Sequence, residues 1–306
     1  MMPMRRIMKR VLKGVCKSSK QRSKPDTTLT INMKIGLIVT GQQALQDYKI
    51  FTASLAVWHP TASLYVYTDS KTDVKSVKWG GQLQIKNGMD AYAGKTRAEM
   101  EALPGKKYDS LFKDYTYEKA AVLEWMFESP ADEGAWFLDA DITLLAPLPQ
   151  IPYTAIVGLS PHYIRQCDTA LYGKYNAGFM WFKSLELLEM WRQAAPASRF
   201  FEQAALETVA AAAGPGLHEF PIQVNFGWWR MFQSPEAPPT IQAKFSVNRT
   251  DKSVGIRYDG QPLQSVHTHW KTQSGDRTMF DFNTWFKQYL DRFKMHKPVA
   301  NLLKIL

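Results

Sequence analysis

The sequence predicts an α/β domain with a mostly parallel central sheet that helices cover on both sides. Three observations support this fold class. A strand–helix–strand pattern begins at Met33, strand-like and helical segments alternate beyond it, and the chain of 306 residues is 45% hydrophobic, which suffices for one large core. We expect residues 1–30 to form a basic arm and residues 31–306 to form a single domain.

The first strand–helix–strand unit places three polar positions at one edge of the sheet. The segment MKIGLIVTG (33–41) is a short apolar strand that Thr40 and Gly41 close, and a helical pattern follows it. SLYVYTDS (63–70) returns to strand composition and ends at Asp69. Because ligands of parallel sheets bind beyond the carboxyl ends of the strands, we expect Thr40, Gly41 and Asp69 at the edge of a cleft.

Apolar periodicity and turn residues predict the later elements in order. Strands are expected in AWFLDAD (135–141) and at 154–158, 175–182 and 267–270. Helices are expected at 109–128, 184–195, 198–213 and 280–294. The last of these carries an aromatic stripe that would pack back on the domain. Residues 71–107 give only weak signals.

Most of the positive charge lies in the N-terminal arm. The net charge is +10, but nine of the 38 Lys and Arg residues fall within residues 1–24, which contain no acid; the other 29 nearly balance the 28 acidic residues. The domain therefore lacks the basic face typical of nucleic-acid binding, and no nucleic-acid partner is expected.

Three interpretations of the arm stay open. It is a solvated leader, a basic amphipathic helix in peripheral contact with an anionic membrane surface, or a transit peptide. The chain has two cysteines, too few for a disulfide framework, and no uninterrupted apolar segment typical of a secretory signal near its start. A cytoplasmic location, with or without association to a membrane surface, is expected.

The segment WFLDADITLL (136–145) holds the main candidate site. Asp139 and Asp141 begin where a buried strand should end. Two carboxylates that point into one cleft repel each other unless a cation binds between them. Mn²⁺ or Mg²⁺ suits such a site, because these ions accept carboxylate oxygens and keep coordination positions open for phosphates.

Four later segments extend the pattern: KYNAGFMWF (174–182), FEQAALETV (201–209), FPIQVNFGWW (220–229) and SVHTHWK (265–271). Together with DAD, and in this order, they resemble the motifs of GT-A-fold glycosyltransferases of the glycogenin and lipopolysaccharide galactosyltransferase group, glycosyltransferase family 8. The resemblance implies a GT-A α/β/α sandwich with a Rossmann-like nucleotide-binding half and an acceptor half. It also implies a nucleotide-diphosphate sugar as donor and a carbohydrate or glycan as acceptor, with retention of anomeric configuration.

The resemblance implies a role for each matching residue. Asp139 would lie near the ribose or the metal, Asp141 would bind the metal, and Lys271 would contact the diphosphate. Asn176 and Gln203 would lie at the sugar, the latter near its anomeric face; an amide is a poor nucleophile, so it would stabilise an oxocarbenium-like state.

This sequence departs from the family pattern in two places. Glu202 stands where the family has Asp, and HTHWK lacks the glycine that the family places between its histidine and lysine. His267 and His269 fall on the same face of a strand, because side chains alternate, so either could be the metal ligand. Four tryptophans are candidates for stacking on sugar rings or for core packing: Trp181, Trp228, Trp229 and Trp270.

Two other functions compete with sugar transfer. LDADITLL also fits the haloacid-dehalogenase phosphatases, with Asp139 as nucleophile, and GDRTMFD (275–281) resembles their late acidic motif. In those enzymes, however, the DxD strand opens the domain, whereas here a βαβ unit precedes it. The second alternative is a non-catalytic protein that binds nucleotide sugars. The phosphatase would release phosphate from a simple monoester and the binding protein would form no product, so an assay can separate both from a glycosyltransferase.

Overall fold

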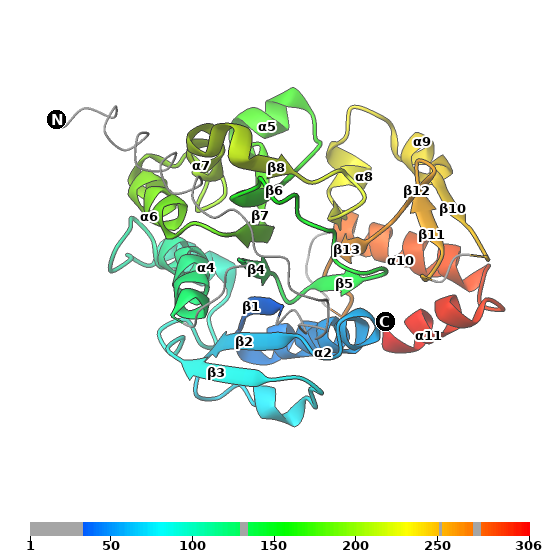
Figure 1. Ribbon diagram of the computed structural model, residues 1–306, viewed down its shortest axis with the longest axis horizontal. Helices are drawn as coiled ribbons and strands as arrows, with labels where there is room; N and C mark the ends of the chain where they lie inside the picture. Colours follow the sequence, from blue (N-terminus) through cyan, green and yellow to red (C-terminus); the bar gives the residue numbers. More distant parts are fainter. Residues whose placement is uncertain (1–32, 129–133, 251–252, 272–276) are drawn as a thin grey trace, which may run out of the picture. The chain divides into compact units, whose positions relative to one another are not determined.

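The structure is a computed structural model that describes residues 33–128, 134–250, 253–271 and 277–306 (Figure 1). The basic arm and the interpretations attached to it lie outside the described residues. Within the described ranges, none of the helices combines the length and the apolar character that a bilayer crossing needs.

A seven-stranded sheet forms the centre of the fold. Its strands run in the order β3-β2-β1-β4-β7-β6-β8. Their bounds are β1 Lys34–Val39, β2 Ser63–Thr68, β3 Leu83–Asn87, β4 Ala135–Leu138, β6 Val157–Pro161, β7 Tyr175–Phe182 and β8 Leu217–Glu219. Only β7 runs antiparallel to its neighbours. The predicted mostly parallel α/β sheet is therefore confirmed.

Helices bury both faces of this sheet, as the apolar runs of its strands require. Along β1, Ile35 and Leu37 pack into the core beneath α2 (Gly41–Trp58), whereas Ile38 packs into the opposite core. That second core lies beneath α4 (Leu111–Phe127), α6 (Leu185–Ala194) and α7 (Leu206–Ala213). Figure 1 shows these helices and α2 on opposite sides of the strands.

The strand order reverses between β1 and β4, and this reversal positions the site. From β1 the chain proceeds outward to β2 and β3, then returns to place β4 on the other side of β1. Both strands are parallel, so the loops after Val39 and Leu138 leave the same edge of the sheet. Crevices at such a reversal are where open α/β sheets bind their ligands.

A small second sheet carries the C-terminal part of the site. It consists of β5 (Ile142–Leu144), β13 (Ser265–His267) and β9 (Phe226–Gly227), with β13 in the middle. Because His267 pairs with Ile142, it comes to lie beside the end of the DAD segment. Long-range pairing therefore unites residues that are far apart in sequence.

The remaining elements lie mainly in the second half of the chain. A third sheet contains β10 (Phe245–Val247), β11 (Ile256–Tyr258) and β12 (Gln261–Pro262). The other helices are α3 (Arg97–Ala102), α5 (Gln166–Tyr172), α8 (Arg230–Gln233), α9 (Pro238–Ala243), α10 (Arg277–Asp291) and α11 (Lys297–Ile305). The aromatic stripe of α10 packs with α11 and the third sheet in one cluster.

Three predicted boundaries were wrong. The strand expected at 154–158 is β6, which spans Val157–Pro161. The strand expected at 267–270 is β13, which spans Ser265–His267 and therefore ends at the first residue of the expected range. The helix expected at 198–213 begins only at Leu206. Phe201 has a φ of 39°, outside helical space, and the next side chain, Glu202, turns inward to an ion pair. Tertiary contacts thus override local helix propensity in the turn before α7.

Candidate active site

A cavity of about 820 Å³ opens at the carboxyl ends of β1 and β4. Its walls come from the start of α2, the segment around α3, helix α4, the turn before α7, and the ends of β7 and β13. Eight of the predicted site residues line it: Thr40, Gly41, Asp139, Asp141, Asn176, Gln203, His267 and His269. Asp69 and Lys271 are not among the described residues that line it.

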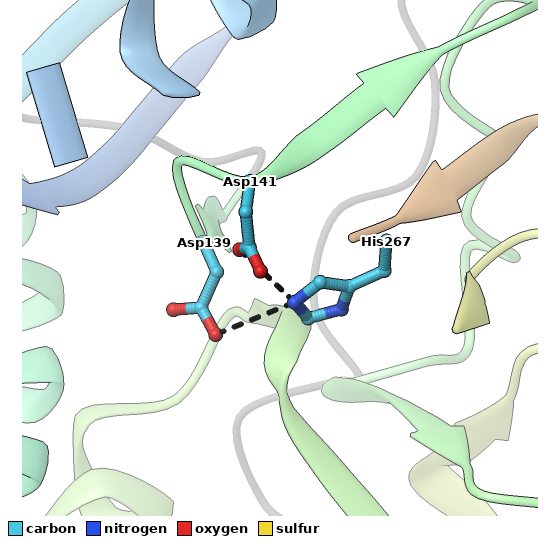
Figure 2. Close-up of side chains that lie close together, drawn as sticks. All are labelled: Asp139, Asp141 and His267. Carbon is cyan, nitrogen blue, oxygen red and sulfur yellow. Dashed lines mark ion pairs between the residues drawn. The ribbon is translucent and has the colours of Figure 1, made fainter. Parts of the chain in front are cut away.

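Asp139, Asp141 and His267 form a cluster at the floor of the cavity. Each offers one ligand atom, and the three atoms lie within 4.8 Å of one another. His267 Nε2 is 3.1 Å from Asp141 Oδ1 and 3.8 Å from Asp139 Oδ2. Figure 2 shows the two aspartates on the turn between β4 and β5, with the imidazole reaching them from the end of β13.

Backbone hydrogen bonds hold the DAD turn in place. Ile142 N–H donates to the Asp139 carbonyl at 3.2 Å, and Asp139 N–H donates to the Gly178 carbonyl at 2.8 Å. Thr268 N–H donates to the Asp141 carbonyl at 3.0 Å. The turn is therefore fixed by both β7 and the strand that supplies His267.

Gly178 allows β7 to pass close to the cluster. The pairing of β7 with β6 is interrupted here: Leu159 pairs with Met180 and Ser160 pairs with Asn176, so Gly178 lies in the irregular stretch between them. A Cβ at position 178 would lie 2.5 Å from His267 Cε1 and would collide with Asp139 Oδ2. A side chain there would occupy the space between Asp139 and His267, so the Asn-Ala-Gly segment needs its glycine for close approach.

Lys119, on α4, is a site residue that the sequence analysis missed. Its ammonium lies 3.1 Å from Asp139 Oδ1 and 3.0 Å from Glu202 Oε1, and it donates to the Ala177 carbonyl at 3.3 Å. Burial opposes its charge, but the carboxylates of Asp139 and Glu202 outweigh burial and raise the pKa of Lys119. The available signal was a lysine on the buried face of an amphipathic helix.

The two aspartates differ in their electrostatic environment. Burial raises the pKa of Asp139. The positive charge of Lys119 opposes this rise and the like charge of Asp141 adds to it, so that the pKa of Asp139 lies above its ordinary value. Burial also opposes ionisation of Asp141, but the imidazoles of His267 and His269 outweigh it and hold the pKa of Asp141 below its ordinary range. A cation bound between the two carboxylates would relieve their mutual repulsion.

His269 approaches Asp141 from another side and belongs to a separate pair. Its Nδ1 lies 2.7 Å from Asp47 Oδ2, and its Nε2 lies 3.5 Å from Asp141 Oδ2. Burial opposes protonation, but the carboxylates of Asp141 and Asp47 outweigh it and raise the pKa of His269 to about 9. The expectation that both histidines share a face agrees with these contacts, and the three-residue cluster contains His267.

Asp69 does not line the cavity but hydrogen-bonds to Thr40 and Gly41, which do. Its two carboxylate oxygens accept five hydrogen bonds, from the Thr40 and Thr72 hydroxyls and from the backbone N–H groups of Gly41, Lys71 and Thr72. Burial alone would raise its pKa, but these hydrogen bonds hold the pKa of Asp69 below its ordinary value. Asp69 thus fixes the start of α2, while Lys271 is exposed outside the cavity.

The two candidates for contact with the sugar, Asn176 and Gln203, both line the cavity. Asn176 Oδ1 accepts from Gly178 N–H at 3.0 Å, and Gln203 Nε2 donates to the Tyr172 carbonyl at 2.9 Å. Of the four candidate tryptophans, Trp229 is the one that lines the cavity, and its ring packs edge-on to His267 at 5.1 Å. Trp181 and Trp270 are buried in cores, and Trp228 packs against one.

The cluster fits a divalent metal ion. Two carboxylate oxygens and one imidazole nitrogen suit Mn²⁺ or Mg²⁺. Adjacent ligands on bonds of about 2.0–2.2 Å lie roughly 3 Å apart, close to the 3.1 Å between His267 Nε2 and Asp141 Oδ1. Asp139, Asp141 and His267 would hold the ion, which would supply positive charge for phosphate oxygens in the cavity.

Comparison with known proteins gives similarities of structure. No protein-family model and no curated protein matches the sequence. The fold is similar to the glycosyltransferase GlyE of Streptococcus pneumoniae TIGR4, with 12% identity and a TM-score of 0.45 over 84% of this chain and 64% of that one. This chain therefore spans less than two thirds of GlyE.

Two further structures are similar at the same level. The galactosyltransferase LgtC, solved with donor and acceptor sugar analogs, has 11% identity and a TM-score of 0.47 over 83% of this chain and 94% of that one. A glycosyltransferase that acts in glycosylation of the major capsid of PBCV-1 has 9% identity and a TM-score of 0.43, over 83% and 99%.

Proposed function

We propose that this protein is a metal-dependent glycosyltransferase that moves a sugar from a nucleotide-diphosphate sugar to a carbohydrate or glycan acceptor. The observation that carries this function is the Asp139–Asp141–His267 cluster at the floor of a cavity large enough for such a donor. A Mn²⁺ or Mg²⁺ ion bound there supplies positive charge for the diphosphate leaving group.

The residues around the cluster divide the donor into parts. Thr40 and Gly41, at the carboxyl end of β1, would hold the nucleotide, as loops at this position do in other α/β sheets. Asn176 and Gln203 also line the cavity and would offer amide groups to sugar hydroxyls. Lys119 lies beneath Asp139 and keeps its carboxylate oriented.

The contacts of the acids that line the cavity support retention of anomeric configuration. Four acids are among its described lining residues: Asp47, Asp139, Asp141 and Glu202. Each contacts a lysine or a histidine within 4 Å. An inverting reaction needs a carboxylate free to accept the proton of the acceptor hydroxyl. Their engagement favours a mechanism in which Gln203 stabilises positive charge at the anomeric carbon.

The phosphatase alternative finds less support in the geometry. Both carboxylate oxygens of Asp139 lie within 3.2 Å of Lys119, which suits a ligand better than an attacking nucleophile. The GDRTMFD segment begins outside the described residues, and its described part, from Arg277, forms the start of helix α10. The described part of the motif is therefore helical.

An assay of reaction products tests this function against both alternatives. Purified protein is incubated with a panel of nucleotide-diphosphate sugars and with a simple phosphate monoester, each with and without Mn²⁺. We expect Mn²⁺-dependent release of nucleoside diphosphate from one donor class and none of phosphate from the monoester. Phosphate release from the monoester would favour the phosphatase. Tight donor binding without any turnover, with a panel of glycan acceptors present, would favour the binding protein.

A further inference from the structure

The side chain of Asn225 contacts His267 on the side opposite the cluster. Asn225 is fully buried and lies just before β9, in the segment FPIQVNFGWW. Its Oδ1 is 3.2 Å from His267 Nδ1. The other ring nitrogen, Nε2, faces Asp139 and Asp141. One imidazole thus bridges a buried amide and the candidate metal site.

Neighbouring groups fix which end of the Asn225 amide faces the histidine. The backbone N–H of Gly178 can only donate, so the Asn176 atom that it contacts at 3.0 Å must be the acceptor oxygen. That oxygen also lies 3.1 Å from Asn225, whose atom there must be the donor Nδ2. Nδ2 lies 3.2 Å from Ser160 Oγ as well. The oxygen of Asn225 therefore faces His267.

The orientation of the amide determines the tautomer of the imidazole. Asn225 Oδ1 can only accept a hydrogen bond, so the hydrogen resides on His267 Nδ1. The lone pair of a neutral ring then lies on Nε2, toward the two aspartates, as metal ligation requires. The edge-on ring of Trp229, 5.1 Å away, limits rotation of the imidazole.

We propose that Asn225 is a positioning residue that fixes the Nδ1–H tautomer of His267 and so prepares Nε2 to bind the divalent ion. Gly178 N–H and Asn225 Nδ2 both donate to Asn176 Oδ1, and this orients the Asn225 amide. Asn225 Oδ1 then accepts from His267 Nδ1. This role rests on the metal site of the proposed function. Asn225 thus has a chemical role in addition to packing. Its hydrogen bonds link Asn176 to His267, the proposed metal ligand.

Mn²⁺ binding by two variants tests the role. Asn225→Leu keeps similar volume and removes the acceptor; outer-shell losses of this kind typically weaken metal affinity by roughly 10- to 100-fold. Ser160→Ala is the matched control, because it removes the other contact of Nδ2 and leaves the Oδ1–His267 bond in place. We expect its affinity to stay within about twofold of the wild type. Free Mn²⁺ is followed by its electron paramagnetic resonance signal.

Nitrogen-15 spectra of the wild type test the same point without a variant, in case Asn225→Leu fails to fold. In the Mg²⁺-loaded protein we expect His267 Nδ1 to carry hydrogen and Nε2 to be free of it. Hydrogen on Nε2, or a folded Asn225→Leu protein that binds Mn²⁺ as tightly as the wild type, would overturn the role. Neither readout uses a sugar donor. A protein that shows the expected tautomer and affinities but transfers no sugar would refute the proposed function alone.

Discussion

Replacing Asp141 by asparagine is expected to lower Mn²⁺-dependent sugar transfer by about 10³-fold. The variant keeps the shape of the side chain but loses the charged ligand that lies 3.1 Å from His267 Nε2. A metal ion stabilises the transition state by several kcal/mol, and about 4 kcal/mol corresponds to this change in rate. The measurement is the steady-state release of nucleoside diphosphate over a range of Mn²⁺ concentrations.

A matched control separates the metal site from the general loss of a carboxylate. Asp291→Asn also converts an acid to an amide, but its side chain is exposed on α10 and contacts Lys294 at 3.2 Å. We expect this control to keep the wild-type rate, and both variants to unfold at temperatures close to the wild type. Wild-type turnover by Asp141→Asn would refute the assignment of Asp141 as a metal ligand.

Replacing Lys119 by methionine is expected to destabilise the metal-free fold by about 3 kcal/mol, because removal of one partner leaves buried charges without compensation. Glu202 is 8% exposed and Asp139 is 28% exposed, so Glu202 carries most of this cost. For a domain of this size, the melting temperature should fall by roughly 6–12 °C. Urea unfolding of wild type and variant gives the free energy difference directly.

Two further unfolding measurements identify why the Lys119→Met variant loses stability. The double variant Lys119→Met/Glu202→Gln removes the stranded charge of Glu202, so it should regain part of the stability. Mn²⁺ should also stabilise the single variant, because the ion supplies positive charge beside Asp139. If Lys119→Met unfolds at the wild-type urea concentration, the Lys119–Asp139–Glu202 contacts contribute little to stability.

Local sequence patterns were sufficient to predict the strands that border the cavity. The strand before Thr40 and the strand before Asp139 are apolar runs of the length that buried parallel strands need. Both end at polar residues, which placed the cleft correctly at the carboxyl edge of the sheet. His267, which the sequence offered as a candidate together with His269, lies beside both aspartates in the structure, and its role as metal ligand stays a prediction.

The partners of these residues could not be predicted, because they are set by pairing between distant segments. Lys119 contacts Asp139 from a helix on one face of the sheet, and Asp47 contacts His269 across 222 positions of sequence. No local pattern marks either contact. The turn that carries Glu202 was predicted as helix, because local helix propensity contains no information on the ion pair between Glu202 and the buried Lys119.

Asp69 is a residue for which the local pattern predicted a contact with ligand but the structure places it outside the cavity lining. Its place at a strand end suggested contact with a ligand, but all of its hydrogen-bonding capacity that the structure shows serves Thr40, Thr72 and nearby backbone groups. A polar residue at the carboxyl end of a strand can therefore build the cavity edge without lining it. Which task it performs depends on neighbours that the strand pattern does not specify.

Thermal unfolding with nucleotide sugars, in the presence and absence of Mn²⁺, tests most directly whether the cluster holds a metal that binds the donor. Ligand that binds only the folded state stabilises it by about 2.7 kcal/mol at 100 times its Kd. We predict that one class of nucleotide-diphosphate sugar raises the melting temperature when Mn²⁺ is present and has little effect when the ion is chelated. Equal stabilisation with and without Mn²⁺, or none with any donor, would contradict a metal-held diphosphate at Asp139, Asp141 and His267.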